Sequence, residues 1–176
     1  CVFESRPTSH EHESRFTAFL PRTTNHEHGF YAMIDLTLPI SADEIIPHRP
    51  PMQLVDRLLE CDTETGSGTV ETVVSRDGFI LTDQGGVAPP VFFEMIAQAY
   101  AAVKGYENLI HGRPVRGGYL VGIREGRVTG AAFPGDCLGV HVETEKSLGD
   151  FSVARGTVKR TGLDIAWAVI KVWSPE

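Results

Sequence analysis

Glu94 and Gln98 are the only charged or amide side chains in an otherwise apolar run from Val91 to Val103. Their spacing of four residues places both side chains on the same side of a helix. An ionised carboxylate in apolar surroundings is strongly unfavourable unless it is paired, hydrogen-bonded or next to water. A position early in a helix adds a favourable dipole term of roughly 0.3 to 1 kcal/mol for the anion. Glu94 is therefore the leading candidate for a functional residue.

A structural role for Glu94 is the alternative that the pattern leaves open. In that case its carboxylate would accept a hydrogen bond from a neighbouring backbone amide or from an arginine, and would only position the helix. The two interpretations differ in one observable feature. A functional carboxylate must be open to a cleft that a substrate can enter.

Other catalytic and cofactor-binding motifs are missing from the sequence. Gly66-Ser67-Gly68 lacks the third glycine of a dinucleotide-binding loop, and there is no phosphate-binding P-loop and no G-x-S-x-G nucleophile motif. His10, His12, His26 and His28 form two His-x-His pairs, which suit metal ligation but have no evident fixed partners. We therefore expect a solvated tail there, with no resident metal and no cofactor.

Residues typical of helix ends flank the apolar run, with Pro89-Pro90 before it and Gly105 after Lys104. This pattern predicts one helix over 91–104, and its apolar character on nearly all sides requires protein around it. Strand-length segments with alternating or β-branched residues lie on both sides of it, over 52–61, 69–75, 119–128, 138–144, 151–159 and 165–173. The sequence predicts an α+β fold in which a five- to six-stranded antiparallel sheet wraps a long central helix.

Length and composition favour one domain without a nucleic-acid or membrane partner. The chain has 176 residues, of which 41% are hydrophobic, and a formal net charge of −7. A surplus of acidic residues argues against binding to nucleic acid, which requires cations against phosphate. No apolar run is long enough to span a bilayer. Three widely spaced cysteines form no disulfide framework, which favours the cytoplasm.

Residues 1–32 differ from the rest of the chain in composition. They contain four of the seven histidines and show no sustained hydrophobic period. We expect a flexible N-terminal extension over residues 1–32 and a single folded domain over residues 33–176.

Three blocks of sequence resemble the FabZ-type 3-hydroxyacyl-acyl-carrier-protein dehydratases. Residues 47–57 (PHRPPMQLVDR) resemble the PHRxPxxLVDR block of that family, and residues 94–98 (EMIAQ) resemble its E-x-M-A-Q helix. Residues 122–127 (GIREGR) and 133–136 (FPGD) resemble its GIDxxR and VPGD segments. The resemblance implies a single hotdog domain that dimerises by joining sheets, with a substrate tunnel at the subunit interface.

The resemblance also implies roles for individual residues. Glu94 matches the catalytic acid, which handles the 3-hydroxyl group as it leaves as water. Val91 and Phe92 would face the tunnel entrance or the neighbouring subunit. His48 belongs to the PHR block, which is not the proton-abstracting position of the family, and we expect it to fix the loop before the first strand. The candidates for substrate contact are Gln98, Val91, Phe92, Pro90, His48 and Gly86.

Two departures separate this chain from the ordinary dehydratases. The family's GHFP block supplies the base that removes the C2 proton, but no histidine lies between Asp77 and Glu94. The family's Pro-Gly before the helix offers an N–H to the thioester carbonyl, and here Pro89 and Pro90 have none. The divergent dehydratase-like branch associated with aryl-polyene biosynthesis shares these features, and this chain resembles that branch more closely.

These observations predict a dehydratase-like protein acting on acyl thioesters in fatty-acid or polyene biosynthesis. One alternative is a hotdog thioesterase, in which a helix carboxylate activates water. The other is a non-catalytic subunit that forms a heterodimer with a catalytic hotdog paralogue. The expected partners are an acyl carrier protein or coenzyme A thioester and a second hotdog subunit, identical or paralogous.

A local surplus of positive charge provides a candidate surface for an acidic carrier protein. Residues 104–127 contain five cations and two acids. An ordinary solvated surface is the alternative. The cations are Lys104, Arg113, Arg116, Arg124 and Arg127.

Overall fold

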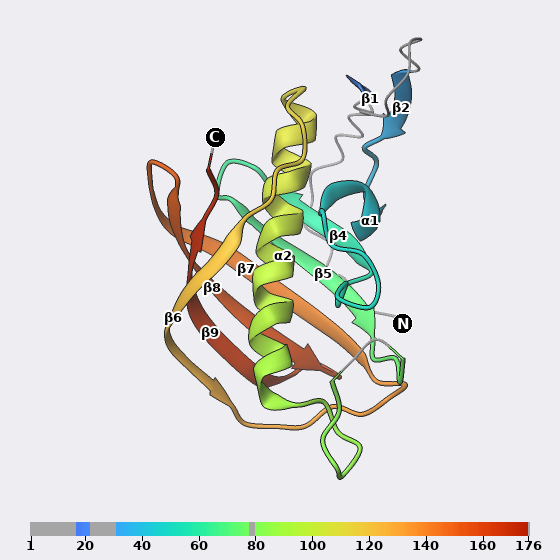
Figure 1. The fold of residues 1–176 in the computed structure, drawn as a ribbon, viewed down its shortest axis with the longest axis vertical. Coiled ribbons are helices and arrows are strands. Elements are labelled where there is room, and N and C mark those ends of the chain that lie inside the picture. The colour runs from blue at the N-terminus through green and yellow to red at the C-terminus, as the bar shows by residue number, and fades with distance from the viewer. Residues whose placement is uncertain (1–16, 22–30, 78–79, 176) are drawn as a thin grey trace.

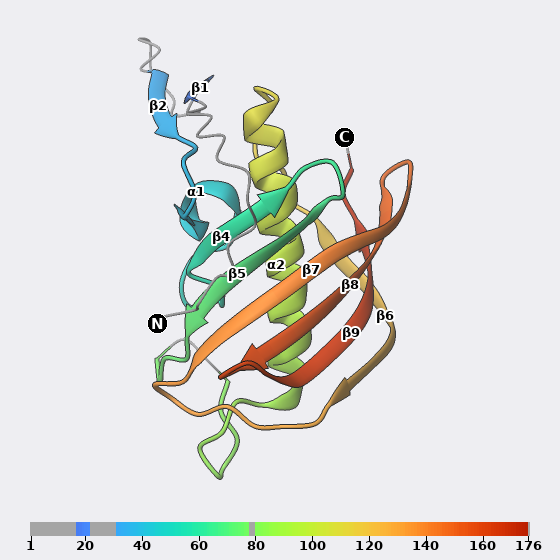
Figure 2. The same ribbon diagram turned by 180° about the vertical axis from the view of Figure 1, so that it is seen from behind.

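The computed structural model describes residues 17–21, 31–77 and 80–175. One long helix, α2 (Pro89–Ile110), lies across the concave face of a curved antiparallel sheet (Figure 1). The view from behind shows the sheet covering the opposite side of the helix (Figure 2). The predicted α+β architecture, with a sheet wrapped around a central helix, is therefore confirmed.

The main sheet has seven strands in the order β3-β4-β5-β7-β8-β9-β6, one more than the upper end of the prediction. The additional strand, β3, has two residues and pairs with the start of β4, so it is too short to show a hydrophobic period. The strands are β3 (Ile40–Ser41), β4 (Arg57–Asp62), β5 (Ser67–Val73), β6 (Tyr119–Val128), β7 (Cys137–Leu148), β8 (Phe151–Arg160) and β9 (Leu163–Trp173).

Several predicted boundaries are wrong. Strand β5, expected over 69–75, covers Ser67–Val73, and β7, expected over 138–144, covers Cys137–Leu148. Two further differences affect the residues around the helix. The strand expected from Met52 begins at Arg57, because Met52 and Leu54 lie in a loop whose backbone is hydrogen-bonded to Gln98 of α2. The helix expected to end before Gly105 continues to Ile110. Gly105 is buried where α2 meets the short helix α1 (Ala42–Ile45), so it serves close packing instead of helix termination.

Small residues in the sheet allow α2 to approach it closely. Phe92, Ile96 and Val103 are buried between the helix and the strands. A Cβ atom at Gly156 of β8 would overlap Ile96 Cγ2, and one at Gly68 of β5 would lie 2.7 Å from Val103 Cγ2. This tight packing fixes the position and rotation of α2, and therefore the direction in which its polar residues point.

Near the N-terminus, β1 (Thr17–Pro21) and β2 (Tyr31–Asp35) form a separate two-stranded antiparallel sheet. The expected boundary between residues 32 and 33 falls within β2. The four histidines of the expected extension lie outside the described residues. The division into a flexible extension and a folded domain stays a prediction.

Candidate active site

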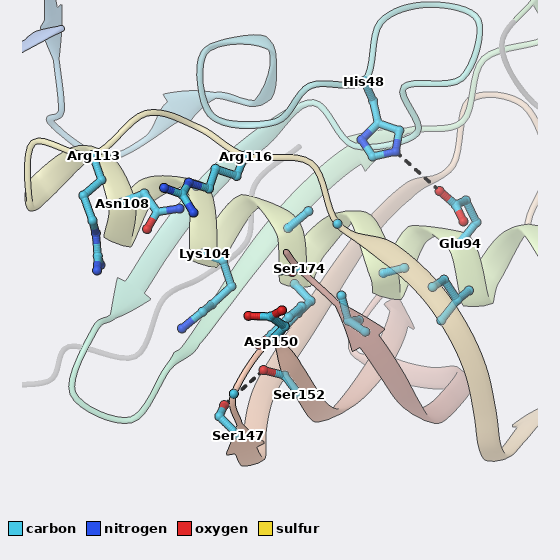
Figure 3. Close-up of a pocket in the computed structure, with 18 residues that line it drawn as sticks. His48, Glu94, Lys104, Asn108, Arg113, Arg116, Ser147, Asp150, Ser152 and Ser174 are labelled. Atoms are coloured by element: carbon cyan, nitrogen blue, oxygen red, sulfur yellow. Dashed lines mark hydrogen bonds and ion pairs between the residues drawn. The ribbon is translucent and has the colours of Figure 1, made fainter. Parts of the chain in front are cut away.

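A pocket of about 360 Å³ lies along one face of α2. Glu94, Ala97, Ala101, Lys104 and Asn108 line it, and their spacing of three or four residues gives one continuous stripe on the helix. At 1.5 Å per residue this stripe is about 21 Å long. The other walls come from the loop before β4, the segment after α2, the β7–β8 hairpin and the end of β9 (Figure 3).

Gln98 positions the Glu94 carboxylate. The Gln98 side chain is fully buried, and its amide donates hydrogen bonds to the Met52 carbonyl at 2.7 Å and to Glu94 Oε1 at 3.0 Å. Its oxygen accepts a hydrogen bond from the Leu54 N–H at 2.8 Å. Gln98 therefore ties the loop before β4 to the helix and holds Oε1 of Glu94.

Glu94 itself is open to the pocket, with 33% of its side chain exposed. Its carboxylate contacts the Gln98 amide and the His48 ring. Among the residues that the structure describes, neither an arginine nor a backbone amide bonds it, as a purely structural role would require. A carboxylate that is held in place and open to a pocket is arranged to exchange a proton with a bound molecule.

His48 lies opposite Glu94 on the loop before β4, and 28% of its side chain is exposed. Its Nε2 atom is 3.9 Å from Glu94 Oε1, which is too long for a hydrogen bond. The close-up shows the imidazole ring pointing toward the carboxylate (Figure 3). The structure thus brings together two residues that are 46 positions apart in the sequence.

The remaining candidates from the sequence do not line this pocket. Val91 and Phe92 are buried in the core, and Pro90 is exposed at the start of α2. Gly86 is buried beside Phe133, and its carbonyl accepts a hydrogen bond from the Thr82 N–H at 2.8 Å. Their expected contacts with substrate stay predictions, because those contacts concern a tunnel shared with a second subunit.

Tyr100 is a pocket residue that sequence reasoning missed. It lines the pocket, and its buried hydroxyl group has no hydrogen-bond partner among the described residues. A buried phenol without a partner is rare in folded proteins and is a ready donor for a bound carbonyl. Within the apolar helix pattern it was indistinguishable from a core aromatic residue. The opposite wall adds Ser147, Asp150, Ser152 and Ser174, which carry no sequence motif.

The five cations predicted as one patch divide into two groups. Lys104, Arg113 and Arg116 line the end of the pocket away from Glu94 (Figure 3). Arg124 and Arg127 lie on β6, outside it. This separation restricts the candidate carrier surface to the pocket end.

The ion pairs at that end leave one cation without a close acid. Glu107 is 2.5 Å from Lys104 Nζ and 3.9 Å from Arg113 Nη2. No ion pair involves Arg116 among the residues that the structure describes. Arg116 is therefore the cation most available to an anionic ligand.

Cys61 is excluded as a nucleophile at neutral pH. Burial, followed by the negative charges of Glu107 and Asp62, raises the pKa of the Cys61 thiol to about 12. The thiolate is the reactive form, so this side chain stays protonated and inert at neutral pH.

The described part of the chain lacks two further features. No cluster of three or more His, Cys, Asp and Glu side chains suited to a metal ion is found there. Within the same residues, none of the helices has the length and apolar character required to cross a bilayer.

Known proteins with the same fold include a dehydratase heterocomplex and a protein of a degradation operon. The dehydratase heterocomplex ApeI:P from Xenorhabdus doucetiae superposes with a TM-score of 0.71, at 22% identity over 78% of this chain and 92% of that one. The E. coli PaaI protein from the phenylacetic acid degradation operon superposes with a TM-score of 0.53, at 14% identity over 66% of this chain and 80% of that one. These similarities confirm the predicted hotdog fold.

Sequence comparison identifies the family of the chain. A 3-hydroxyacyl-[acyl-carrier-protein] dehydratase FabZ from Paramagnetospirillum magneticum is 30% identical over 154 residues, covering 83% of this chain and 91% of that one. The sequence model of the ApeP-like family, described as ApeP dehydratase, matches residues 40–176. The protein is thus a FabZ-like dehydratase of the hotdog class. Within that class, it belongs to the ApeP-like dehydratase family, and the resemblance drawn from the sequence motifs is confirmed.

Proposed function

We propose that the protein removes water from a 3-hydroxyacyl chain carried as a thioester on an acyl carrier protein, in a polyene-type pathway. The observation that carries this proposal is the Glu94 carboxylate, held by Gln98 and open to a pocket that runs along α2. Glu94 donates the proton with which the 3-hydroxyl group leaves as water. The side chains of Ala97 and Ala101 line the pocket and contact the apolar part of the substrate.

The polar end of the pocket suits the anionic part of a carrier-bound substrate. Lys104, Arg113 and Arg116 lie there on a protein that is acidic as a whole. Positive charge at the mouth of a pocket steers an acidic carrier protein toward it. The acyl chain then enters from this end and extends along α2 toward Glu94.

The edge strand β6 supports assembly with a second hotdog subunit. It is the last strand of the main sheet, and the exposed side chains of Tyr119, Val121 and Ile123 lie along it. An apolar, unpaired edge strand is a site for joining another sheet. The second subunit is a copy of this chain or a paralogue, and the substrate contacts expected of Val91 and Phe92 would form at the interface with it.

The function is tested by incubating the purified chain with a 3-hydroxyacyl thioester on an acyl carrier protein and resolving the products by mass spectrometry. The expected product is the 2-enoyl thioester, formed with no added metal or cofactor. Release of the free acid would instead identify a thioesterase. Turnover only after adding a histidine-bearing hotdog paralogue would identify this chain as a non-catalytic subunit.

Reversing the charge of the pocket end tests the carrier-binding surface. The double variant R113E/R116E is expected to bind the acyl carrier protein on the order of tenfold more weakly at low salt, because two attractive charges become repulsive. The difference should shrink as salt screens the charges. Affinity is measured by titration calorimetry at several salt concentrations.

The control for this variant is R76E, which changes an exposed arginine outside the pocket. It should leave carrier affinity within about twofold, since screening limits the effect of distant surface charges. A short uncharged pantetheine thioester should be turned over equally by R113E/R116E and the unmodified protein. Unchanged carrier affinity in R113E/R116E would show that the carrier docks elsewhere.

A further inference from the structure

We propose that His48 is the base of this site and removes the C2 proton of the substrate. This inference rests on the proposed function. Because the chain lacks the GHFP histidine, the base of the reaction has no assigned residue, and the inference names one. The geometry that supports it is the approach of His48 Nε2 to within 3.9 Å of Glu94 Oε1 inside one pocket. At this separation the two groups are not hydrogen-bonded to each other. One can therefore reach the C2 proton of a bound substrate while the other reaches its C3 hydroxyl group.

The ring of His48 makes none of the contacts expected of a loop-fixing residue. Its Nδ1 atom is buried without a hydrogen-bond partner, and its Nε2 atom is hydrogen-bonded to no residue that the structure describes. A histidine kept for structure normally donates or accepts through at least one ring nitrogen. The imidazole is therefore available to a bound molecule.

Other groups hold the loop in place without the imidazole. The Arg49 guanidinium donates to the Ile46 carbonyl at 2.9 Å and to the His48 carbonyl at 2.6 Å. The N–H groups of Met52 and Gln53 both donate to the Arg49 carbonyl, and Gln98 bonds the backbone at Met52 and Leu54. The loop is anchored through its backbone and Arg49, so the ring of His48 can be removed while these contacts remain.

All protons and electron pairs in the proposed step are exchanged among His48, Glu94 and the substrate. The neutral imidazole Nε2 takes the C2 proton, and the C2–H electron pair becomes the C2=C3 double bond. The C3–O bond breaks, and the leaving oxygen takes the proton of the Glu94 carboxylic acid to form water. Transfer of one proton from the imidazolium to the carboxylate, through one water molecule, restores the pair. The net reaction is 3-hydroxyacyl thioester to 2-enoyl thioester and water.

The experiment compares H48Q with the unmodified protein as the full chain, using the 3-hydroxyacyl carrier-protein substrate. Glutamine keeps a polar side chain of similar reach but cannot accept the proton. We expect kcat to fall about 10²- to 10⁴-fold, the range for loss of a general base, with KM within about threefold and the urea unfolding midpoint unchanged. The control is H141Q, which makes the same change at an exposed histidine on β7, outside the pocket.

The outcomes separate this inference from the proposed function. If the unmodified protein does not dehydrate the substrate, the proposed function fails. If it does, and H48Q keeps kcat within about threefold, His48 is not the base and the function stands. A fall in kcat that comes with a lowered unfolding midpoint or a raised KM would assign His48 a structural or binding role and also overturn the inference.

Discussion

Replacing Glu94 by glutamine is expected to reduce dehydration about 10²- to 10⁴-fold, the range for loss of a general acid. The amide has the size of the carboxyl group but cannot release a proton to the leaving hydroxyl. Gln98 can still donate a hydrogen bond to the amide oxygen of the new side chain, as it does to Glu94 Oε1. The free energy of unfolding should therefore stay within about 0.5 kcal/mol, as for a surface change. Steady-state kinetics and urea unfolding measure the two quantities.

The matched control for E94Q is E64Q, in the exposed turn between β4 and β5, outside the pocket. It removes one negative charge in the same way and should leave kcat unchanged. E94D is also informative, because a carboxyl group withdrawn by one methylene keeps its acidity but loses its contact with Gln98 and should retain partial activity. If E94Q kept more than a tenth of the original kcat, Glu94 would be no catalytic acid.

Glu94 could be predicted from the sequence because a single carboxylate stands out in an apolar helix. The same reasoning failed to find the pairing with His48. His48 lies in a loop, and its approach to Glu94 depends on the path of residues 49–56, which Gln98 and Arg49 fix through backbone carbonyls and N–H groups. Such contacts leave no periodic signal in the sequence. The site residues outside α2 therefore required the folded structure.

Strands β6, β8 and β9 could be predicted closely, since β6 has the expected bounds and β8 and β9 are longer than expected by one and two residues. Strand β7 continues four residues beyond its expected end. Along β8 the buried positions Ala154, Gly156 and Val158 alternate, and a one-residue shift would expose that face. Helix α2 was predicted too short for a different reason. A glycine after an apolar run normally marks a helix end, and only the neighbouring α1 shows that Gly105 is inside the helix.

Replacing Gly105 by alanine is expected to destabilise the protein by about 3 kcal/mol or more, at the upper end of the range for overpacking. A Cβ atom there would overlap the Ile45 carbonyl oxygen and lie 2.9 Å from the Ile45 carbonyl carbon. Both partners are backbone, so neither can rotate away as a side chain would. In an uncrowded helix the same change would stabilise by roughly 0.5 to 1 kcal/mol, which gives the opposite sign.

The sign of this change in the free energy of unfolding, measured in urea, tests the contact between α1 and α2. G117A is the control, because a Cβ atom at Gly117 meets nothing within 4 Å and its backbone is not in the left-handed region. It should stay within about 0.5 kcal/mol of the unmodified protein. A stabilised G105A would mean that α2 does not pack on α1 as described. Because Gly105 also lines the pocket, the shape of the site beside Lys104 would then change as well.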